Sequence, residues 1–320
     1  IIRDFIKHNI SSILHAISKR NSLMKVHKVF SSMLGGVFTA GFGGSIGLEA
    51  PAASSASSLS SNLARMLHLN FKDRMLLIGC ATAGTIASIF NAPIAALVLA
   101  MEVLMLDLTM ASIIPLLIAS VSATISSRLI LGDALLLHID LVEQFKVSNL
   151  YLYILLGVFC GFLSVLFTKV FYQTTHLLKK IKHKINRAIL GGLFLGVLIF
   201  IIPPLFGEGF ETINLLLADK GQEIITGNYV ESICTSESAL LLVIFSMIFF
   251  KIIATSVSVG VGGIGGVFAP ALFLGSALGF VFAKFVNHFF LLELSISNFS
   301  LVSMAGLIAG VLHAPLTAIF

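Results

Sequence analysis

The sequence contains no tryptophan, only 3 cysteines in 320 residues, and few charged residues, 11% in all. Soluble domains carry roughly 25% charged residues, so this content argues against an ordinary soluble protein. Cys80, Cys160 and Cys234 are scattered, mostly within apolar runs, and indicate neither a disulfide framework nor a metal site. HExxH, Walker A and CxxC patterns are also absent from the sequence. We therefore expect no metal, no cofactor and no enzymatic activity.

Apolar residues dominate what is present. They make up 57% of the chain, and the mean hydropathy is +1.04. The apolar runs are continuous rather than alternating, which favours helices over a β-barrel. This composition predicts an all-α, multi-pass protein of the cell membrane, surrounded by the lipid bilayer. The net charge of +5 gives no reason to expect a nucleic-acid partner. Its densest basic cluster, residues 179–187, predicts a cytoplasmic loop.

Several of the predicted apolar segments are shorter than the roughly 20 residues that cross a bilayer. Short segments interrupted by Gly or Pro, at matching places in two halves, point to the binding site of a transporter. Residues 207–236 form the most polar part and predict a loop with short helices. The predicted apolar segments are 30–42, 74–104 with a break at 91–93, 110–131, 150–171, 189–206, 239–259, 267–289 and 301–320.

One carboxylate stands within a glycine-rich stretch. Residues 43–51 read GGSIGLEAP and include Glu49, and residues 52–67 predict a helix with Pro51 in its first turn. A helix N-terminus carries free N–H groups and a partial positive charge, so it attracts anions. A carboxylate there can fill the site or leave it to a dissolved anion, which is the action of a gate. The alternative is that Glu49 only caps its helix.

The same pattern occurs a second time. Residues 262–270 read GGIGGVFAP and match residues 43–51 at five of nine positions, with an offset of 219 (262 minus 43). Residues 305–318 match residues 83–96 at seven of fourteen positions, with an offset of 222 (305 minus 83). We therefore predict one membrane domain over 1–320, truncated at both ends and built from two repeats, about 1–131 and 150–320. With an odd number of spans between them, the repeats are inverted and their helix starts meet near the midplane.

These motifs resemble those of the CLC chloride channels and chloride/proton antiporters. Gly47-Leu48-Glu49-Ala50-Pro51 is similar to the family's G-[KR]-E-G-P motif, and Gly265 to Pro270 matches its GG-[IV]-F-A-P motif. The resemblance implies an inverted-repeat helical fold, a homodimer with one pore per subunit, and chloride as the anion. Nitrate, bromide and fluoride stay open.

The resemblance also implies site residues. It makes Glu49 and Phe268 gate residues. The family's G-S-G-I-P motif has no clean match and falls by spacing on residues 7–11, which puts His8 at the serine position. The implied anion-binding residues are His8, Asn9, Gly47, Leu48, Gly266, Val267, Phe268 and Ala269.

Other departures from the family pattern bear on the mechanism. Leu48 replaces a basic residue, and Ala50 replaces a glycine. Val103 stands where the antiporters have a proton-accepting Glu, which resembles the channel branch. A voltage- or pH-gated chloride channel is therefore our first interpretation and a chloride/proton antiporter the second, with Glu102 on the candidate proton path or else a structural carboxylate. The family's pore Tyr would lie past Phe320, so none of the chain's tyrosines is assigned to it.

Two enzyme-like patterns lack the preceding strand that such sites need. Ser45 lies in a G-x-S-x-G pattern, but the strand of a nucleophile elbow is missing, and an intramembrane hydrolase would have only His313 as its base. Residues 260–265 satisfy G-x-G-x-x-G without the preceding strand that a dinucleotide site needs.

Lys251 is either a charge on the pathway or the partner of a buried acid such as Glu102.

Overall fold

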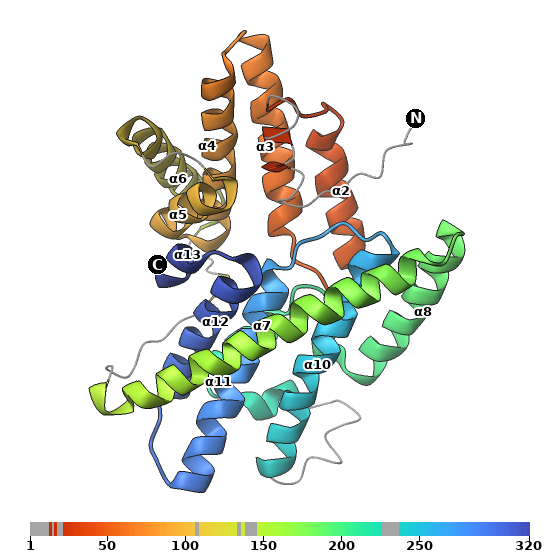
Figure 1. The fold of residues 1–320 in the computed structure, drawn as a ribbon, viewed down its shortest axis with the longest axis vertical. Coiled ribbons are helices and arrows are strands. Elements are labelled where there is room, and N and C mark those ends of the chain that lie inside the picture. The colour runs from red at the N-terminus through yellow and green to blue at the C-terminus, as the bar shows by residue number, and fades with distance from the viewer. Residues whose placement is uncertain are drawn as a thin grey trace.

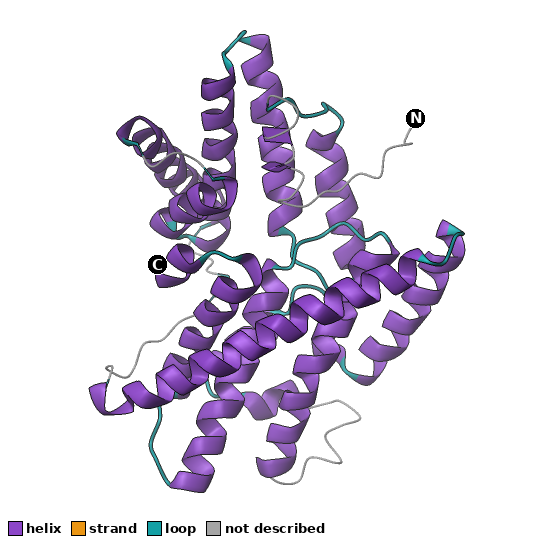
Figure 2. Ribbon diagram, viewed as in Figure 1, coloured by secondary structure: helices purple, strands orange, loops and turns teal. Residues whose placement is uncertain are grey.

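The computed structural model describes residues 13–14, 16–17, 22–105, 109–132, 136–137, 146–225 and 237–320. Within these ranges the chain is helical, and several of its loops meet near the middle of the molecule (Figure 2). Three short 3-10 helices, η1 (Val147–Asn149), η2 (Pro203–Leu205) and η3 (Gly221–Ile224), join the longer ones. The α-helices are α2 (Lys28–Gly41), α3 (Glu49–Met66), α4 (Phe71–Phe90), α5 (Pro93–Leu104), α6 (Met110–Leu131), α7 (Leu150–Lys179), α8 (Lys184–Ile201), α9 (Phe210–Leu217), α10 (Glu237–Val261), α11 (Phe268–Phe290), α12 (Ile296–Leu312) and α13 (Pro315–Ile319).

Six helical segments of the described chain are long and apolar enough to cross a membrane. They are Phe71–Phe90, Met110–Leu131, Val147–Lys179, Lys184–Ile201, Glu237–Val261 and Phe268–Phe290. Four of them are mostly outside the buried core of the isolated chain, as expected for surfaces that contact lipid, whereas Glu237–Val261 and Phe268–Phe290 are mostly buried. The prediction of an all-α, multi-pass membrane protein is therefore confirmed.

Two breaks in the apolar runs have the same cause. Asn91 ends α4 in the left-handed conformation at φ 57°, and Pro93, which lacks an N–H, starts α5. This break was predicted. The single segment predicted over 301–320 was wrong, because His313 ends α12 at φ 55° and Pro315 starts α13. The two breaks correspond through the sequence repeat.

The inverted repeat is visible in the helix directions. In Figure 1, α2 descends to the centre and α3 rises from it, whereas α10 rises to the centre and α11 descends from it. Two hydrogen bonds between the repeats are related by the same symmetry. Thr39 Oγ1 accepts the Ile264 N–H at 3.1 Å, and Ser258 Oγ accepts the Ser45 N–H at 3.0 Å. Thr39 and Ser258 differ by 219 positions, as do Ser45 and Ile264. The structure therefore confirms the inverted repeat.

Small residues let α11 and α12 approach closely. A Cβ atom added at Gly279 would lie 2.5 Å from the carbonyl oxygen of Phe299 and 2.5 Å from the Cα of Ser300. These are backbone atoms, so they cannot move aside as a flexible side chain would. Close backbone approach at small residues is a common way for helices to associate in membranes. This contact holds α11, and with it the start of α11, in place.

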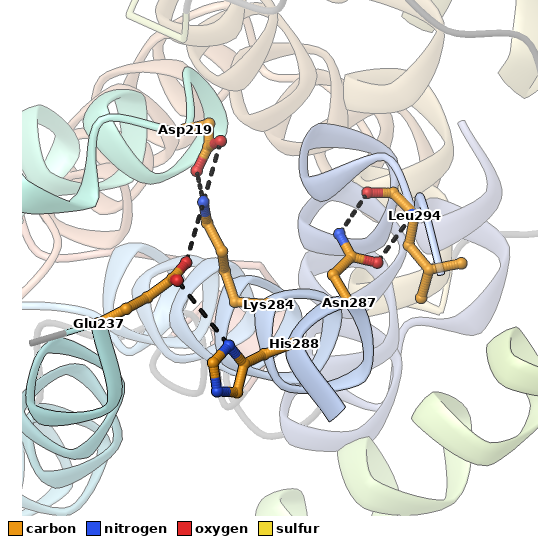
Figure 3. A network of polar contacts seen from close by, with 6 residues as sticks. All are labelled: Asp219, Glu237, Lys284, Asn287, His288 and Leu294. Carbon is orange, nitrogen blue, oxygen red and sulfur yellow. Dashed lines mark hydrogen bonds and ion pairs between the residues drawn. The ribbon is translucent and has the colours of Figure 1, made fainter. Parts of the chain in front are cut away.

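The far end of α11 carries a polar network (Figure 3). Lys284 Nζ lies 2.9 Å from Asp219 Oδ1 and 3.8 Å from Glu237 Oε1, and His288 lies 3.9 Å from Glu237. Asn287 exchanges two hydrogen bonds with the backbone of Leu294. The carboxylates are about half exposed, so each ion pair contributes only about 0.2–1 kcal/mol. The network joins the ends of α9, α10 and α11.

The helix contact at Gly279 yields a stability prediction. Gly279→Ala should destabilise the protein by about 1–3 kcal/mol, because the added methyl group meets backbone atoms. Gly157→Ala on α7 is a matched control, since a Cβ atom there has no neighbour within 4 Å. The control should be neutral or stabilising by up to ~1 kcal/mol through helix propensity. Thermal unfolding of both variants in detergent tests this, and equal unfolding midpoints would contradict it.

Candidate functional site

The chain makes the same turn before α3 and before α11. Gly43 has φ 93° and Gly262 has φ 117°, a backbone region that favours glycine. The next residue in each case donates its N–H back to the preceding helix. Gly44 donates to Thr39 O at 2.7 Å, and Gly263 donates to Ser258 O at 2.9 Å. The start of α3 in the first repeat and the start of α11 in the second therefore point to the centre of the molecule with the same local geometry.

The two helix starts are joined directly. Gly47 and Gly266 form an antiparallel bridge, in which Gly47 N–H donates to Gly266 O at 3.0 Å and Gly266 N–H donates to Gly47 O at 2.8 Å. A Cβ atom at Gly266 would lie 2.8 Å from Ala50 Cβ, and one at Gly47 would collide with Glu49 Oε2. Gly266 therefore has no space for a side chain, and a side chain at Gly47 would displace the Glu49 carboxylate.

This bridge brings six of the predicted anion-binding residues together. Because α3 and α11 run away from the centre in opposite directions, their positive ends face the same region (Figure 1). The N–H groups of a first helical turn have no partner within the helix, so they are free to bind a negative group. The residues at the two starts are Gly47 and Leu48 of the first repeat and Gly266, Val267, Phe268 and Ala269 of the second. Their binding roles stay predictions.

Glu49 is buried at this point. The residue is 4% exposed, and its carboxylate lies against the backbone N–H groups of Glu49 itself and of Ala269 at the start of α11, although no side chain is a hydrogen-bond partner among the described residues. An N-cap side chain normally accepts a hydrogen bond from an N–H of its own first turn. Because the carboxylate interacts with the N–H of the first residue of α3, capping stays an alternative to the gate role. A buried carboxylate with no cationic side chain in contact is costly, which is typical of a functional group.

Phe268 begins α11 and is also buried. Its ring centroid lies 5.2 Å from that of Phe90, at the end of α4, and its side chain is 8% exposed. The contact links the start of α11 to the first break in the apolar runs. The assignment of Phe268 as a gate stays a prediction.

Sequence reasoning missed Glu208, which lies in the loop between η2 and α9. Its Oε1 accepts the Leu48 N–H at 2.7 Å, so a carboxylate already binds the start of α3. Glu208 also interacts electrostatically with Glu49 and with Lys251. The signal available in the sequence was a lone acid between two glycines, Gly207-Glu208-Gly209, directly after an apolar run.

The structure excludes one of the alternatives left open for Lys251, a pairing with Glu102. This side chain is 0% exposed, and its Nζ donates to the carbonyls of Leu205 at 3.3 Å and Gly207 at 3.1 Å. It also lies over the Phe273 ring, 4.7 Å from the centroid. Lys251 therefore holds the loop that carries Glu208 and is not the partner of Glu102.

Glu102 binds elsewhere, at the start of α13. Its carboxylate accepts the N–H of Leu316 at 3.0 Å, the N–H of Thr317 at 2.9 Å and the hydroxyl of Thr317 at 2.8 Å. These contacts are those of a structural carboxylate that joins the two repeats. A proton-path role for Glu102 stays a prediction.

The remaining site predictions do not join this cluster. His8 and Asn9 lie outside the described residues. Ser45 is buried and uses its N–H to bind Ser258, while His313 is exposed as the left-handed end of α12, so the hydrolase alternative has no support. Within the described ranges, no three His, Cys, Asp or Glu side chains form a metal-binding group.

Comparison with known proteins agrees with this architecture. The family model described as "Voltage gated chloride channel" matches residues 1–320. The putative chloride channel protein ClcB-like of Ralstonia nicotianae is 28% identical over 95% of this chain and 66% of its own length. The H(+)/Cl(-) exchange transporter ClcA of Vibrio parahaemolyticus is 27% identical over 89% of this chain and 59% of its own length. The chain thus spans two thirds or less of these relatives.

Solved structures show the same fold. A slow cyanobacterial Cl-/H+ antiporter superposes with a TM-score of 0.78 at 19% identity, covering 98% of this chain and 76% of its own. A CLC-type fluoride/proton antiporter superposes with a TM-score of 0.75 at 20% identity, covering 96% of this chain and 73% of its own. With its bridged helix starts, inverted repeat and full-length family match, this multi-pass membrane chain belongs to the voltage gated chloride channel (CLC) family.

Proposed function

We propose that this protein carries a small anion, chloride in the first place, across the membrane, with Glu49 as the gate. The observation that carries the proposal is the buried Glu49 carboxylate, which lies where the α3 and α11 starts meet, beside the backbone amides of Glu49 and Ala269. When ionised, the carboxylate takes the place of the anion at the amides. When protonated, it loses its charge and its attraction for the positive helix ends, and the anion enters.

A gated channel is our first candidate. Its support is Val103, an apolar residue at the position where the antiporters of the family have a proton-accepting acid. The two gate residues then act on one path: Glu49 at the start of α3, and Phe268, whose ring lies at the start of α11.

Proton-coupled exchange is the second candidate. A relative and two solved neighbours are described as Cl-/H+ or fluoride/proton antiporters. Exchange needs a route for protons to Glu49 from the other side, and Glu102 is the candidate acid for it.

The active form is proposed to be a homodimer with one pore in each subunit. The support is the family resemblance.

The gate proposal predicts the pH response of a charge-neutral variant. In the full-length protein reconstituted in liposomes, chloride flux should rise as external pH falls. Glu49→Gln should carry chloride at all pH values near the acid-pH rate, which is a gain of about tenfold at neutral pH if ionised Glu49 holds the site by ~1.4 kcal/mol. The glutamine cannot ionise, so it cannot titrate.

Glu211→Gln is the matched control, because Glu211 is an exposed acid in the first turn of α9. It should keep the parental pH dependence. A Glu49→Gln variant whose flux varies with pH as in the parent would show that Glu49 is not the gate.

A second prediction separates the two roles of Glu102. Glu102→Gln should lower stability by about 1.5–3 kcal/mol, because the amide loses charge-assisted hydrogen bonds from α13. Thr317→Val is the matched control: it removes one donor to Glu102 and leaves the carboxylate. Thermal unfolding and simultaneous recording of chloride and protons in liposomes measure both roles. If the parent moves protons, and only Glu102→Gln loses that movement, Glu102 is on the proton path and the channel interpretation is wrong.

A further inference from the structure

Glu208 occupies one of the backbone amides that the proposed function assigns to the anion. Its Oε1 lies 2.7 Å from Leu48 N, at the residue directly before Glu49. Two carboxylates therefore meet at the start of α3, one from the helix itself and one from the loop after η2. They repel each other electrostatically. Glu208 is partly exposed, whereas Glu49 is almost fully buried.

The loop carrying Glu208 is built to place this carboxylate. Gly209 has φ 87°, and a Cβ atom there would lie 2.7 Å from the Phe273 ring and 3.3 Å from Lys251 Nζ. Lys251 binds the carbonyls of Leu205 and Gly207, in the segment just before α9 begins at Phe210. A fully buried ammonium and a close-packed glycine thus fix the backbone on both sides of Glu208.

The charges at this place are Glu49 from α3, Glu208 from the loop and Lys251 from α10. Leu48 brings no charge. At the start of α11, the residues from Gly266 to Ala269 are uncharged as well. With both acids ionised, the local side-chain charge is therefore −1, and neutralising either acid makes it zero. An entering anion meets a repulsion that depends on both carboxylates.

Lys251, the cation beside Glu208, has no charged counterpart in the first repeat. The residue that corresponds to Lys251 in the first repeat, 219 positions earlier, is Ser32, whose hydroxyl donates to Ser54. Ser54 corresponds in the same way to Phe273, which lies under Lys251. The two repeats thus share this helix contact, but only the second uses it to bury a cation. Ordinary helix packing at this position does not require the charge.

We propose that Glu208 is a second, tethered competitor for the anion site, and that Lys251 sets its strength. Resting on the proposed anion transport, this inference adds that the Leu48 amide is shared between Glu208 and the transported anion. For the anion to bind Leu48, the Glu208 carboxylate leaves this amide. Lys251 then retains the charge of Glu208 close by, so that the carboxylate returns when the anion moves on.

The test is chloride binding to the full-length protein in detergent, by isothermal titration calorimetry at neutral pH, with fluoride titrated alongside. Glu208→Gln keeps an acceptor for Leu48 N–H but removes the charge. The Kd of Glu208→Gln for chloride or fluoride should be about tenfold or more below that of the parent, because the variant has lost a negative charge beside the anion site. Lys251→Met should bind the anion more weakly, since the compensating cation is lost. Glu211→Gln, the exposed acid nearby, should bind as the parent does.

A purely structural role for Glu208 predicts a different result. Glu208→Gln would then shift the unfolding midpoint and leave the anion Kd unchanged, which overturns the inference. If Lys251→Met does not fold, Lys251→Arg is measured in its place. Because this variant keeps the charge, its anion Kd should equal that of the parent. A tenfold change in that Kd would count against the charge argument. Chloride flux that loses its pH dependence in Glu49→Gln, with unchanged binding in Glu208→Gln, removes this inference alone. No anion binding or flux in the parent removes the proposed function itself.

Discussion

The rest of the site depends on the two hydrogen bonds between Gly47 and Gly266. They join the inverted repeats at the point where two helices begin, where a side chain at Gly266 would meet Ala50 and one at Gly47 would displace the Glu49 carboxylate. The bridge thereby points the positive ends of α3 and α11 at one region inside an apolar protein. A membrane interior offers no water to satisfy such N–H groups, so an anion or a carboxylate has to do so. Helix packing at Gly279 and the symmetric Thr39 and Ser258 contacts maintain this arrangement.

Few charges control the site because few are present. Glu49 and Glu208 lie at the same helix start, and buried Lys251 offsets one of them. In an apolar surrounding such charges act over longer distances than at a protein surface, because the effective dielectric constant is low. A single proton or a single chloride ion therefore changes the local balance. This is why one carboxylate suffices for the proposed gate.

The helical fold and the inverted repeat could be predicted from the sequence, because apolar runs and two recurring glycine motifs record them directly. Glu49 and the glycines of both helix starts were found for the same reason. Glu208 was not, because the contact between Leu48 and Glu208 joins residues 160 positions apart and leaves no local pattern. The partner of Lys251 was open for the same reason. The split of 301–320 was missed although Pro315 marks it, since hydropathy alone does not show a break within an apolar run.

The most direct measurement of the central claim is the position of a bound halide. Crystals of the full-length Glu49→Gln variant grown with bromide would locate the ion by its anomalous scattering. We expect a peak between the starts of α3 and α11, within hydrogen-bond distance of the amides around Leu48 and Phe268. In protein shown to conduct bromide, a peak elsewhere and none at these amides would contradict the account.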